Sequence, residues 1–578
     1  MPHLRRLLPY LRAHRHHLAG GLVCLLLTTL LSVATPWVLR LAVDDLTLRV
    51  TQRKLGLYAG LVVGLALVEG VFRYLMRMVL IGMSREIEYE LRNDLFRHLT
   101  RLPASYFRDH RIGDLMSRAN SDMSAVRLVL GPGIMYTANT LATSVGALAL
   151  MLAISPRLLG LAVVPLVFVS WLVRYFGRRI HDRFEAVQAQ LASLTAVVQE
   201  SLAGIRVVRA YVQEPQELAR FEAEGRQYLE GNRSLIRMYG SLFPAVQLLT
   251  GLGAVMVVLV GGRMAIAGSI SLGEFVAFAA YLAMLHWPTI ALGWVVNIFE
   301  RGEASMGRLD QILDTVPEIK DQETEPGPPL QGAVEFRRLS FGYGGEPVLR
   351  DIDLSVPAGS TVAIVGPTGC GKSTLVSLLP RLYQAPPGTV FVDGRDVRRI
   401  PLGELRAAVG LVPQETFLFS ASVRENLAFG LPGDGASRVE WAAQVAQLAG
   451  DIAAFPQGYE TFVGERGITL SGGQKQRAAL ARALAGDPRI LILDDALSAV
   501  DTETEEGILS GLRQVMRNRT TFLVSHRVST VREADLIVVL REGRIVERGN
   551  HQELLALGGF YADLHRRQQL EEEMEKTA

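Results

Sequence analysis

A glycine-rich segment in the second half of the chain has the composition of a phosphate-binding loop. Residues 366–374 read GPTGCGKST. Glycines let backbone N–H groups point at phosphate oxygens, a lysine neutralises the β- and γ-phosphates, and a serine hydroxyl can hold Mg²⁺. An apolar run precedes the loop and a helix-prone run follows it, which is the context that this motif requires. The segment predicts that ATP and Mg²⁺ bind at Gly366, Thr368, Gly369, Cys370, Gly371, Lys372, Ser373 and Thr374.

Two consecutive carboxylates follow a second apolar run. The run covers residues 490–493, and Asp494 and Asp495 come directly after it. A carboxylate at the end of a buried strand is the expected partner of the magnesium ion that a phosphate loop holds. We therefore predict that Ser373 and Asp494 are metal ligands.

The motif Leu470-Ser471-Gly472-Gly473-Gln474 narrows the class of ATP-binding protein to which this chain can belong. A serine and two glycines at the start of a helix present N–H donors to an anion. These residues, and their order relative to the other motifs, resemble the signature of the ABC transporter family. The resemblance implies that two ATP molecules lie between two such domains, and that a lone chain is inactive. It also implies that the signature binds the ATP of the opposite subunit through Ser471, Gly472, Gly473 and Gln474.

Four further residues resemble functional positions of this family. Tyr343 is similar to the aromatic residue that stacks on adenine, and Asp501 to an aspartate that crosses the interface between two subunits. Gln414 resembles the glutamine that touches Mg²⁺ and water. His526 resembles the histidine that contacts the γ-phosphate. The resemblance implies that Asp495, His526 and Gln414 form the catalytic set.

One position departs from the family pattern. The residue after the metal-binding aspartate is usually a glutamate that acts as general base, whereas here it is Asp495. Aspartate is one methylene shorter, so its carboxylate falls short by about 1.5 Å, and misplacement by about 1 Å can cost on the order of 100-fold in rate. We predict that the site built on this chain's own loop binds ATP but hydrolyses it slowly.

An intact signature beside a weakened catalytic position is typical of one half of a heterodimer. In this respect the chain resembles one subunit of heterodimeric exporters of the TmrAB type. In such a pair the partner is a second half-transporter that supplies the glutamate, and the signature Ser471–Gln474 completes the partner's active site. A homodimer that is slow, or one in which Asp495 suffices, is the competing interpretation.

Six apolar runs, all before about residue 300, are long enough to cross a bilayer. A helix needs about 20 apolar residues to do so, and the first run is too long for the core of a signal peptide. The residues after the second and fourth runs are charged and helix-prone, which predicts helices that continue far beyond the membrane. The predicted spans are 18–43, 55–80, 131–154, 157–177, 242–265 and 275–298.

Arginines gather on one side of these spans. They are frequent over residues 85–118 and near residue 180, which belong to the long extensions, so the positive-inside rule places that side in the cytoplasm. The connections on the other side, at 47–54, 155–156 and 267–271, are short. We predict a multi-pass protein of a bacterial inner membrane whose nucleotide-binding domain is cytoplasmic.

After a proline-rich linker the chain alternates strand-like and helix-like runs. The strand-like runs are 334–338, 361–365, 390–392, 490–493, 521–524 and 536–540. The predicted fold class is a membrane α-helical bundle of six transmembrane helices with long cytoplasmic extensions, plus an α/β P-loop nucleotide-binding domain of ABC type. The predicted domains are a transmembrane domain at 1–314, a linker at 315–332, the ATPase domain at 333–570 and a tail at 571–578.

Two segments of the membrane half extend the resemblance to ABC exporters. Residues 102–107 and 113–118, with Asp122, resemble their first intracellular loop, and residues 199–211 resemble the stretch before the second. The resemblance implies ATP-driven outward transport by alternating access. Few charges in the spans favour an amphipathic cargo such as drugs, peptides or lipids. A homodimeric lipid flippase and a regulatory subunit that moves nothing are the alternatives, and the six spans exclude an ABC ATPase that acts on nucleic acid.

Polar residues near the spans carry less specific interpretations. Glu69, Arg73 and Arg77 lie on one face of the second predicted helix. They either line an inner cavity, or Glu69 and Arg73 pair with each other. His286 in the sixth span either faces substrate or packs against neighbouring helices. His14, His16 and His17 fit an interfacial helix face better than a ligand set.

Overall fold

The computed structural model describes residues 2–48, 50–321, 324–325, 327–431, 435–464, 467 and 469–577. Residues 322, 323 and 326 of the predicted linker, and Ala578 of the predicted tail, lie outside the described residues. The chain forms two compact units, which are described separately. The first contains Met1–Leu99 and Ile112–Thr315, and the second contains Thr100–Arg111 and Val316–Ala578.

The first unit is helical. Among the described residues, six helical segments are long and apolar enough to cross a membrane, which confirms the predicted number of spans. They comprise Arg15–Leu48, Gln52–Leu99, Ile112–Ile154, Pro156–Ala203, Glu214–Ile266 and Leu272–Leu313. The individual helices are η1 (His3–Leu7), α1 (Leu8–Ala13), α2 (Arg15–Leu48), α3 (Gln52–Leu99), α5 (Ile112–Ser117), η2 (Arg118–Asp122), α6 (Met123–Leu128), η3 (Val129–Gly133), α7 (Ile134–Ile154), α8 (Pro156–Ala203), α9 (Ile205–Ala210), α10 (Glu214–Met256), η4 (Val257–Gly261), α11 (Gly262–Ile266), α12 (Leu272–Met284) and α13 (His286–Leu313).

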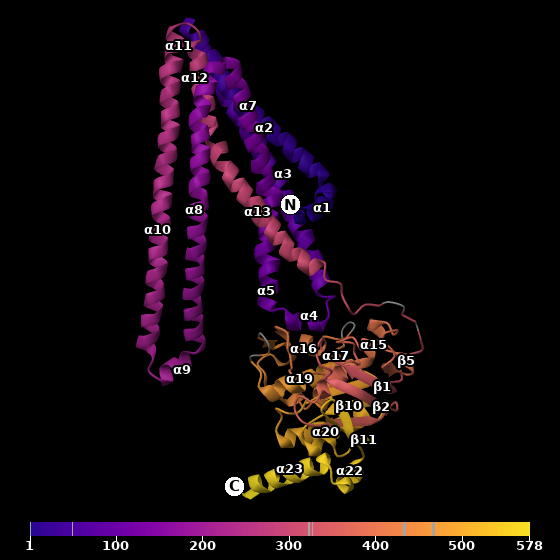
Figure 1. Cartoon of the computed structure of the whole chain (residues 1–578). Helices are drawn as coiled ribbons and strands as arrows, with labels where there is room; N and C mark the ends of the chain where they lie inside the picture. The colour runs from indigo at the N-terminus through magenta and orange to yellow at the C-terminus, as the bar shows by residue number, and fades with distance from the viewer. Residues whose placement is uncertain are drawn as a thin grey trace. The chain divides into compact units, whose positions relative to one another are not determined.

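Several of these helices are much longer than a bilayer is thick. Helices α3 and α8 contain 48 residues each, which corresponds to about 72 Å at about 1.5 Å per residue. The hydrocarbon core is about 30 Å thick, so the predicted extensions beyond the membrane are present. Helix α10 runs beside α8, and the short α9 joins the two at one end (Figure 1).

A polar cluster fixes α12 to α2 beside the short turn that opens α12. Ser271 begins α12 with a capping box, in which its hydroxyl accepts a hydrogen bond from the N–H of Glu274. The Ser271 hydroxyl and the Gly273 N–H each donate to the carboxylate of Asp44 over 2.7 Å. Arg40 forms an ion pair with Glu274 at 2.8 Å. The cluster satisfies the free N–H groups of the α12 terminus, which would otherwise lack partners.

The second unit is an α/β domain built on two principal sheets. A six-stranded sheet has the order β12-β11-β3-β10-β9-β6, in which only β12 is antiparallel to its neighbour, and a four-stranded antiparallel sheet has the order β2-β1-β4-β5. The strands are β1 (Val334–Phe341), β2 (Leu349–Val356), β3 (Thr361–Val365), β4 (Val390–Val392), β5 (Arg395–Asp396), β6 (Val409–Val412), β7 (Ala421–Ser422), β8 (Phe462–Val463), β9 (Ile490–Asp494), β10 (Thr520–Val524), β11 (Leu536–Arg541) and β12 (Arg544–Gly549).

Helices surround these sheets, and each of the six predicted strand-like runs lies within a strand. The helices of this unit are α4 (Ala104–Asp109), α14 (Lys372–Ser377), α15 (Leu402–Ala408), α16 (Val423–Leu427), α17 (Ala436–Val445), α18 (Ala449–Ala454), η5 (Gly458–Glu460), α19 (Gly472–Ala485), α20 (Thr502–Met516), α21 (Val528–Val531), α22 (His551–Leu557) and α23 (Phe560–Thr577). Helix α23 continues through residues 571–577 of the predicted tail.

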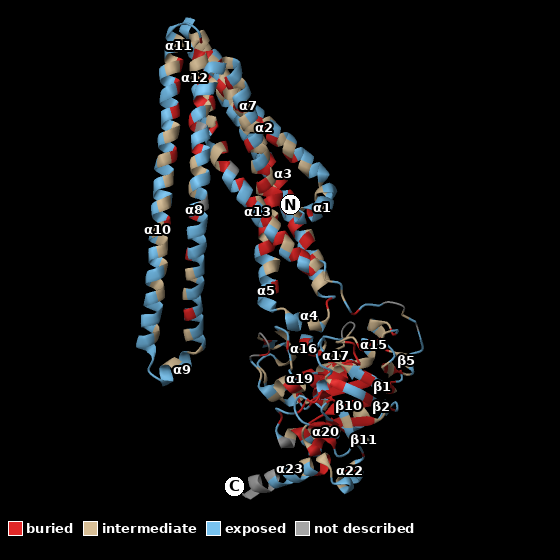
Figure 2. Ribbon diagram, viewed as in Figure 1, coloured by how far each residue is buried: buried red, intermediate tan, exposed pale blue. Residues whose placement is uncertain are grey.

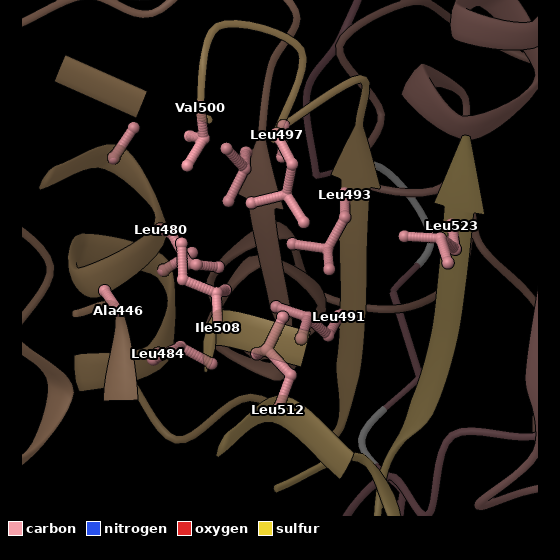
Figure 3. Close-up of a cluster of buried hydrophobic side chains, with 14 of the residues drawn as sticks. Ala446, Leu480, Leu484, Leu491, Leu493, Leu497, Val500, Ile508, Leu512 and Leu523 are labelled. Carbon is pink, nitrogen blue, oxygen red and sulfur yellow. The ribbon is translucent and has the colours of Figure 1, made fainter. Parts of the chain in front are cut away.

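Both faces of the central parallel strands are covered. Every residue of β3, β9 and β10 is buried, as the red ribbon of Figure 2 shows. Alternate residues enter two different cores: Leu491 and Leu493 pack with α19 and α20, whereas Ile490 and Ile492 join the core beside the antiparallel sheet. Figure 3 shows the first of these cores. Burial on both faces explains why these strands read as continuous apolar runs in the sequence.

The close approach at Gly273 generates a stability prediction. A Cβ there would collide with the carbonyl oxygen of Arg40 and lie 2.7 Å from Oδ1 of Asp44. We expect Gly273→Ala to destabilise the protein by about 1–3 kcal/mol, as overpacked sites do, and to lower the melting temperature in nanodiscs. Gly64→Ala is the matched control, because a Cβ at Gly64 meets nothing within 4 Å. Equal melting temperatures for the two variants would contradict this packing.

Candidate functional site

The candidate site lies at one edge of the parallel sheet. The carboxyl ends of the neighbouring parallel strands are aligned, since Val524 of β10 pairs with Ile364 of β3 and with Asp494 of β9. Strand β6 is paired to β9 in the same direction. The segments that follow β3, β6, β9 and β10 therefore leave the sheet at one edge, where parallel α/β sheets bind ligands.

The loop after β3 depends on glycine at two positions. A Cβ at Gly366 would collide with the carbonyl oxygen of Leu540, and one at Gly371 would lie 2.8 Å from the side chain of Leu349. Gly371 also has φ of +102°, a conformation that other residues rarely adopt. Thr368 and Gly369 lie exposed at the loop, whereas Cys370 is buried. Burial raises the pKa of the Cys370 thiol.

Lys372, Ser373 and Asp494 meet at this loop. Lys372 is buried, and its ammonium donates to the carbonyl oxygens of Gly366 and Pro367, each at 2.9 Å. Burial raises the pKa of Asp494, while a hydrogen bond from Ser373 opposes that rise. The neighbouring charges that act on Asp494 are those of Asp495, Lys372 and His526. The structure thus brings together residues that lie on three different segments of the sequence.

Asp495 directly follows β9 in a left-handed backbone conformation. Its φ is +50°, and its N–H donates to the carbonyl oxygen of Val524 at 2.9 Å. Its own carbonyl accepts from the hydroxyl of Ser498 at 3.0 Å. Aspartate tolerates this conformation better than most residues. The backbone at the position of the missing glutamate is therefore held on both sides, and its carboxylate is half-buried.

His526 and Gln414 follow β10 and β6 by two residues each. His526 is half-buried, and its carbonyl oxygen accepts a hydrogen bond from Nε2 of Gln568 at 2.5 Å. His526 is one of the groups that oppose the rise in the pKa of Asp494, which places the histidine in the same group. The Gln414 side chain is exposed beside the end of β6. Both residues therefore lie at the sheet edge that carries the phosphate loop.

Tyr343 lies in an aromatic group that includes an unexpected arginine. Its hydroxyl donates to Oγ1 of Thr374 at 2.9 Å, which links it to the phosphate loop. The guanidinium of Arg108, from α4, lies 4.8 Å from the centre of the Tyr343 ring. Tyr383 meets the same ring edge-on at 4.9 Å. Sequence reasoning missed Arg108 and Tyr383, because neither carries a motif and only the fold brings α4 to Tyr343.

The signature residues begin helix α19. The Ser471 hydroxyl accepts from the N–H of Gln474, and the Gln474 side chain accepts from the N–H of Ser471, so the two form a capping box. The Gln474 amide also donates to Asp451 at 2.8 Å. Gly472 and Gly473 lie against Ala499, and a Cβ at Gly473 would approach the Ala499 carbonyl oxygen to 3.1 Å.

A buried glutamine ties the signature helix to the segment after β9. Gln476 accepts from the N–H of Ala499 at 2.8 Å and donates to the Ser498 hydroxyl at 2.9 Å. Gln476 is 5% exposed. Sequence reasoning missed it, because its hydrogen-bond partner lies 23 residues away along the chain. A glutamine two residues beyond a signature motif, facing inward on the helix, is the signal that could have found it.

Asp501 caps helix α20. Its side chain accepts from the N–H of Thr504 at 2.9 Å, and this hydrogen bond lowers the pKa of Asp501. Among the described residues, no hydrogen bond or ion pair links residues 471–474 to the phosphate loop. The predicted site residues therefore form two groups, one around the phosphate loop and one made of the signature and the segment that leads to Asp501.

Family models match both units. Residues 18–289 match the model of the ABC transporter transmembrane region, and residues 349–498 match the ABC transporter model. The second match includes the phosphate loop, the signature and Asp494.

Curated relatives match over almost the whole length. The chain is 35% identical to the multidrug resistance-like ATP-binding protein MdlA of Escherichia coli over 97% of this chain and 96% of that protein. It is 34% identical to an ATP-dependent lipid A-core flippase of Syntrophus aciditrophicus, covering 98% and 94% of the two chains. A solved structure of a bacterial Atm1-family ABC exporter with ATP bound has a TM-score of 0.80 and 30% identity, covering 96% and 98% of the two chains.

The buried contacts of Gln476 generate the prediction for this site. Gln476→Leu keeps a similar volume but leaves the N–H of Ala499 without its partner, which costs about 1–3 kcal/mol. We expect a lower melting temperature for the purified full chain. Gln444→Leu is the matched control, since Gln444 is exposed on the neighbouring α17. If both variants melt at the same temperature, the Gln476 contacts do not stabilise this unit.

Proposed function

The chain belongs to the ABC transporter family, and from that premise we propose that it is one subunit of an exporter that moves amphipathic molecules outward at the expense of ATP. The observation that carries the proposal is the convergence of Lys372, Ser373 and Asp494 in a chain whose described residues also include six helical segments long and apolar enough to span a membrane. The ATP-binding unit then lies in the cytoplasm, and the spans lie in a bacterial inner membrane.

Each residue of the phosphate-loop group has a role in binding ATP. The N–H groups of the loop and the Lys372 ammonium bind the phosphates, in place of the backbone carbonyls that Lys372 now contacts. Tyr343 stacks on adenine, and its hydrogen bond to Thr374 couples the base position to the loop. Arg108 holds the Tyr343 ring by a cation–π contact. The short helix α4 thereby senses whether the base is bound.

The oxygen donors near Asp494 fit a magnesium ion. The Ser373 hydroxyl donates to the Asp494 carboxylate, so both are already adjacent, and hydroxyl and carboxylate oxygens are ligands that Mg²⁺ accepts. Gln414, at the end of β6, is the third candidate ligand. When bound, the ion neutralises charge on the phosphates. Because burial raises the pKa of Asp494, protonation competes with metal binding at a higher pH than for an exposed aspartate.

The second group of residues acts across an interface with another chain. The capping box uses the N–H groups of Ser471 and Gln474, so those of Gly472 and Gly473 are the ones offered to an anion at this helix start, and no hydrogen bond among the described residues joins residues 471–474 to this chain's own loop. We assign them to the γ-phosphate of ATP held by a second half-transporter. Gln476 connects them to the segment before Asp501, so both parts of the interface move together.

Asp495 sets how fast this chain's own site works. The residue that accepts the proton of the attacking water must reach it, and aspartate is about 1.5 Å shorter than glutamate. His526, which acts on the pKa of Asp494, is assigned to the γ-phosphate of the bound ATP. We infer a heterodimer in which a partner chain with glutamate at this position carries the faster site.

The membrane half has a cavity suited to apolar cargo. It lies among α8, α10, η4, α12 and α13 and has a volume of about 360 Å³. Its walls are mostly aliphatic, with Thr250 and His286 as the polar exceptions. Glu69 and Arg73 form an ion pair within α3, which favours pairing over the alternative in which both line a cavity. An amphipathic molecule with a large apolar part fits this composition.

A homodimeric lipid flippase is the second candidate. It is favoured by the 34% identity to a protein described as a lipid A-core flippase. The same cavity accepts an acyl chain, and a homodimer needs only that the carboxylate of Asp495 can still reach the attacking water. The two candidates differ in cargo and in partner, and two measurements separate them.

The first measurement is the ATPase rate of the chain alone in nanodiscs, as wild type and as Asp495→Glu. We expect a nearly silent wild type and a rise on the order of 100-fold with the longer side chain. Lys372→Ala in the Asp495→Glu background should abolish the rise, which assigns the activity to this chain. A wild-type rate of about 1 s⁻¹ or more, as ordinary enzymes show, would instead favour the homodimer.

The second measurement is transport in vesicles that contain the assembled complex. We expect ATP to drive accumulation of an amphipathic dye, and Lys372→Ala in both subunits to abolish it. Movement of labelled lipid without movement of dye would favour the flippase. ATP binding without transport of either would identify a regulatory subunit.

A further inference from the structure

Histidine and glutamate side chains gather near the start of the first membrane helix and have no role in binding ATP. His14 lies between α1 and α2, His17 lies in the first turn of α2, and Glu86 and Glu90 lie one turn apart on α3. One ligand atom from each of His14, His17 and Glu86 lies within 4.8 Å of the others. Two imidazoles and a carboxylate are a ligand set that Zn²⁺ and related divalent ions accept.

The orientation of His14 matches that of a metal-bound histidine. Its Nδ1 lies 3.4 Å from Oε2 of Glu86, and its Nε2 lies 3.1 Å from Oε1 of Glu90. One ring nitrogen thus faces the ligand group while the other has a carboxylate partner. Metal-binding histidines almost always donate their second ring N–H in this way, which fixes the tautomer and the ring plane.

The surrounding contacts hold the two segments in place. The Tyr10 hydroxyl in α1 donates to Asp94 in α3 at 2.7 Å, so α1 is tied to α3 close to this group. The His14 side chain is only 15% exposed, whereas that of Glu86 is 57% exposed. His17 is also exposed. One ligand is therefore fixed by packing, and the exposed pair leaves a path by which an ion can enter.

We propose that His14, His17 and Glu86 bind one divalent transition-metal ion of the Zn²⁺ type, with Glu90 as the hydrogen-bond acceptor of His14. The bound ion connects the beginning of the first span to the long extension of the second. Because it binds only when these helices are packed, it stabilises the first unit. His16 is exposed between the two ligands in sequence and lies outside the group.

The test is a Zn²⁺ titration by calorimetry of the full chain in nanodiscs, purified through a tag without histidines. We expect one ion per chain and a higher melting temperature with Zn²⁺. His14→Ala and His17→Ala should each remove this binding and the thermal shift. His16→Ala is the matched control and should keep both. Binding of an ATP analogue, measured in parallel, verifies that each variant is folded.

A further variant tests the role of Glu90. Glu90→Gln keeps an oxygen for the hydrogen bond but removes the charge, so we expect a stoichiometry of one with affinity about 10–100-fold lower. The proposal is overturned if the wild type binds no more Zn²⁺ than His14→Ala. It is also overturned if His16→Ala weakens binding as much as His17→Ala does, because the histidines would then act as a non-specific cluster.

Discussion

Burial of both faces of the parallel sheet is the constraint on which the ATP site depends. The strands β3, β9 and β10 are held between two hydrophobic cores, so they cannot slide or twist relative to one another without exposing aliphatic side chains. Their ends therefore stay at one edge. Three segments far apart in the sequence thereby deliver Lys372, Asp494 and His526 to one place with little freedom of position.

The same packing extends to the parts that face another chain in the proposed dimer. Helix α19 and strand β9 share one hydrophobic core, to which Leu480 and Leu484 of the helix and Leu491 and Leu493 of the strand belong (Figure 3). A change at the end of β9 is thus transmitted in two ways to the signature, by packing and by the hydrogen bonds of Gln476. In the proposed dimer, rigid contacts within each chain would couple ATP binding at one site to the ability of the other site to bind ATP.

Much of this arrangement could be predicted from the sequence because its signals are local. The six spans and the six strand-like runs follow from hydrophobic patterning, and the phosphate loop and signature follow from short motifs in a fixed order. Tertiary neighbours leave no such signal. In the sequence, nothing distinguishes Arg108 from the other arginines, and its role follows only from the contact of α4 with Tyr343. Gln476 likewise has no distinguishing sequence feature, and its role follows from its hydrogen bond to Ala499.

The histidines near the first span illustrate the same limit. In the sequence, His14, His16 and His17 fit an interfacial helix face better than a ligand set, and no carboxylate lies near them along the chain. The carboxylates come from α3, about 70 residues later, and only packing brings Glu86 and Glu90 to His14. An interpretation based on sequence neighbours alone cannot find a ligand that comes from another helix.

The buried thiol of Cys370 has a consequence for the durability of the ATP site. A thiol reacts with oxidants and electrophiles as its thiolate, and burial raises the pKa of this one, so little thiolate forms at neutral pH. The phosphate loop thus carries a sulfur atom that resists sulfenylation and disulfide exchange. The only other cysteine of the chain is Cys24 in α2. Oxidative stress that inactivates enzymes with exposed cysteines should therefore leave nucleotide binding here intact.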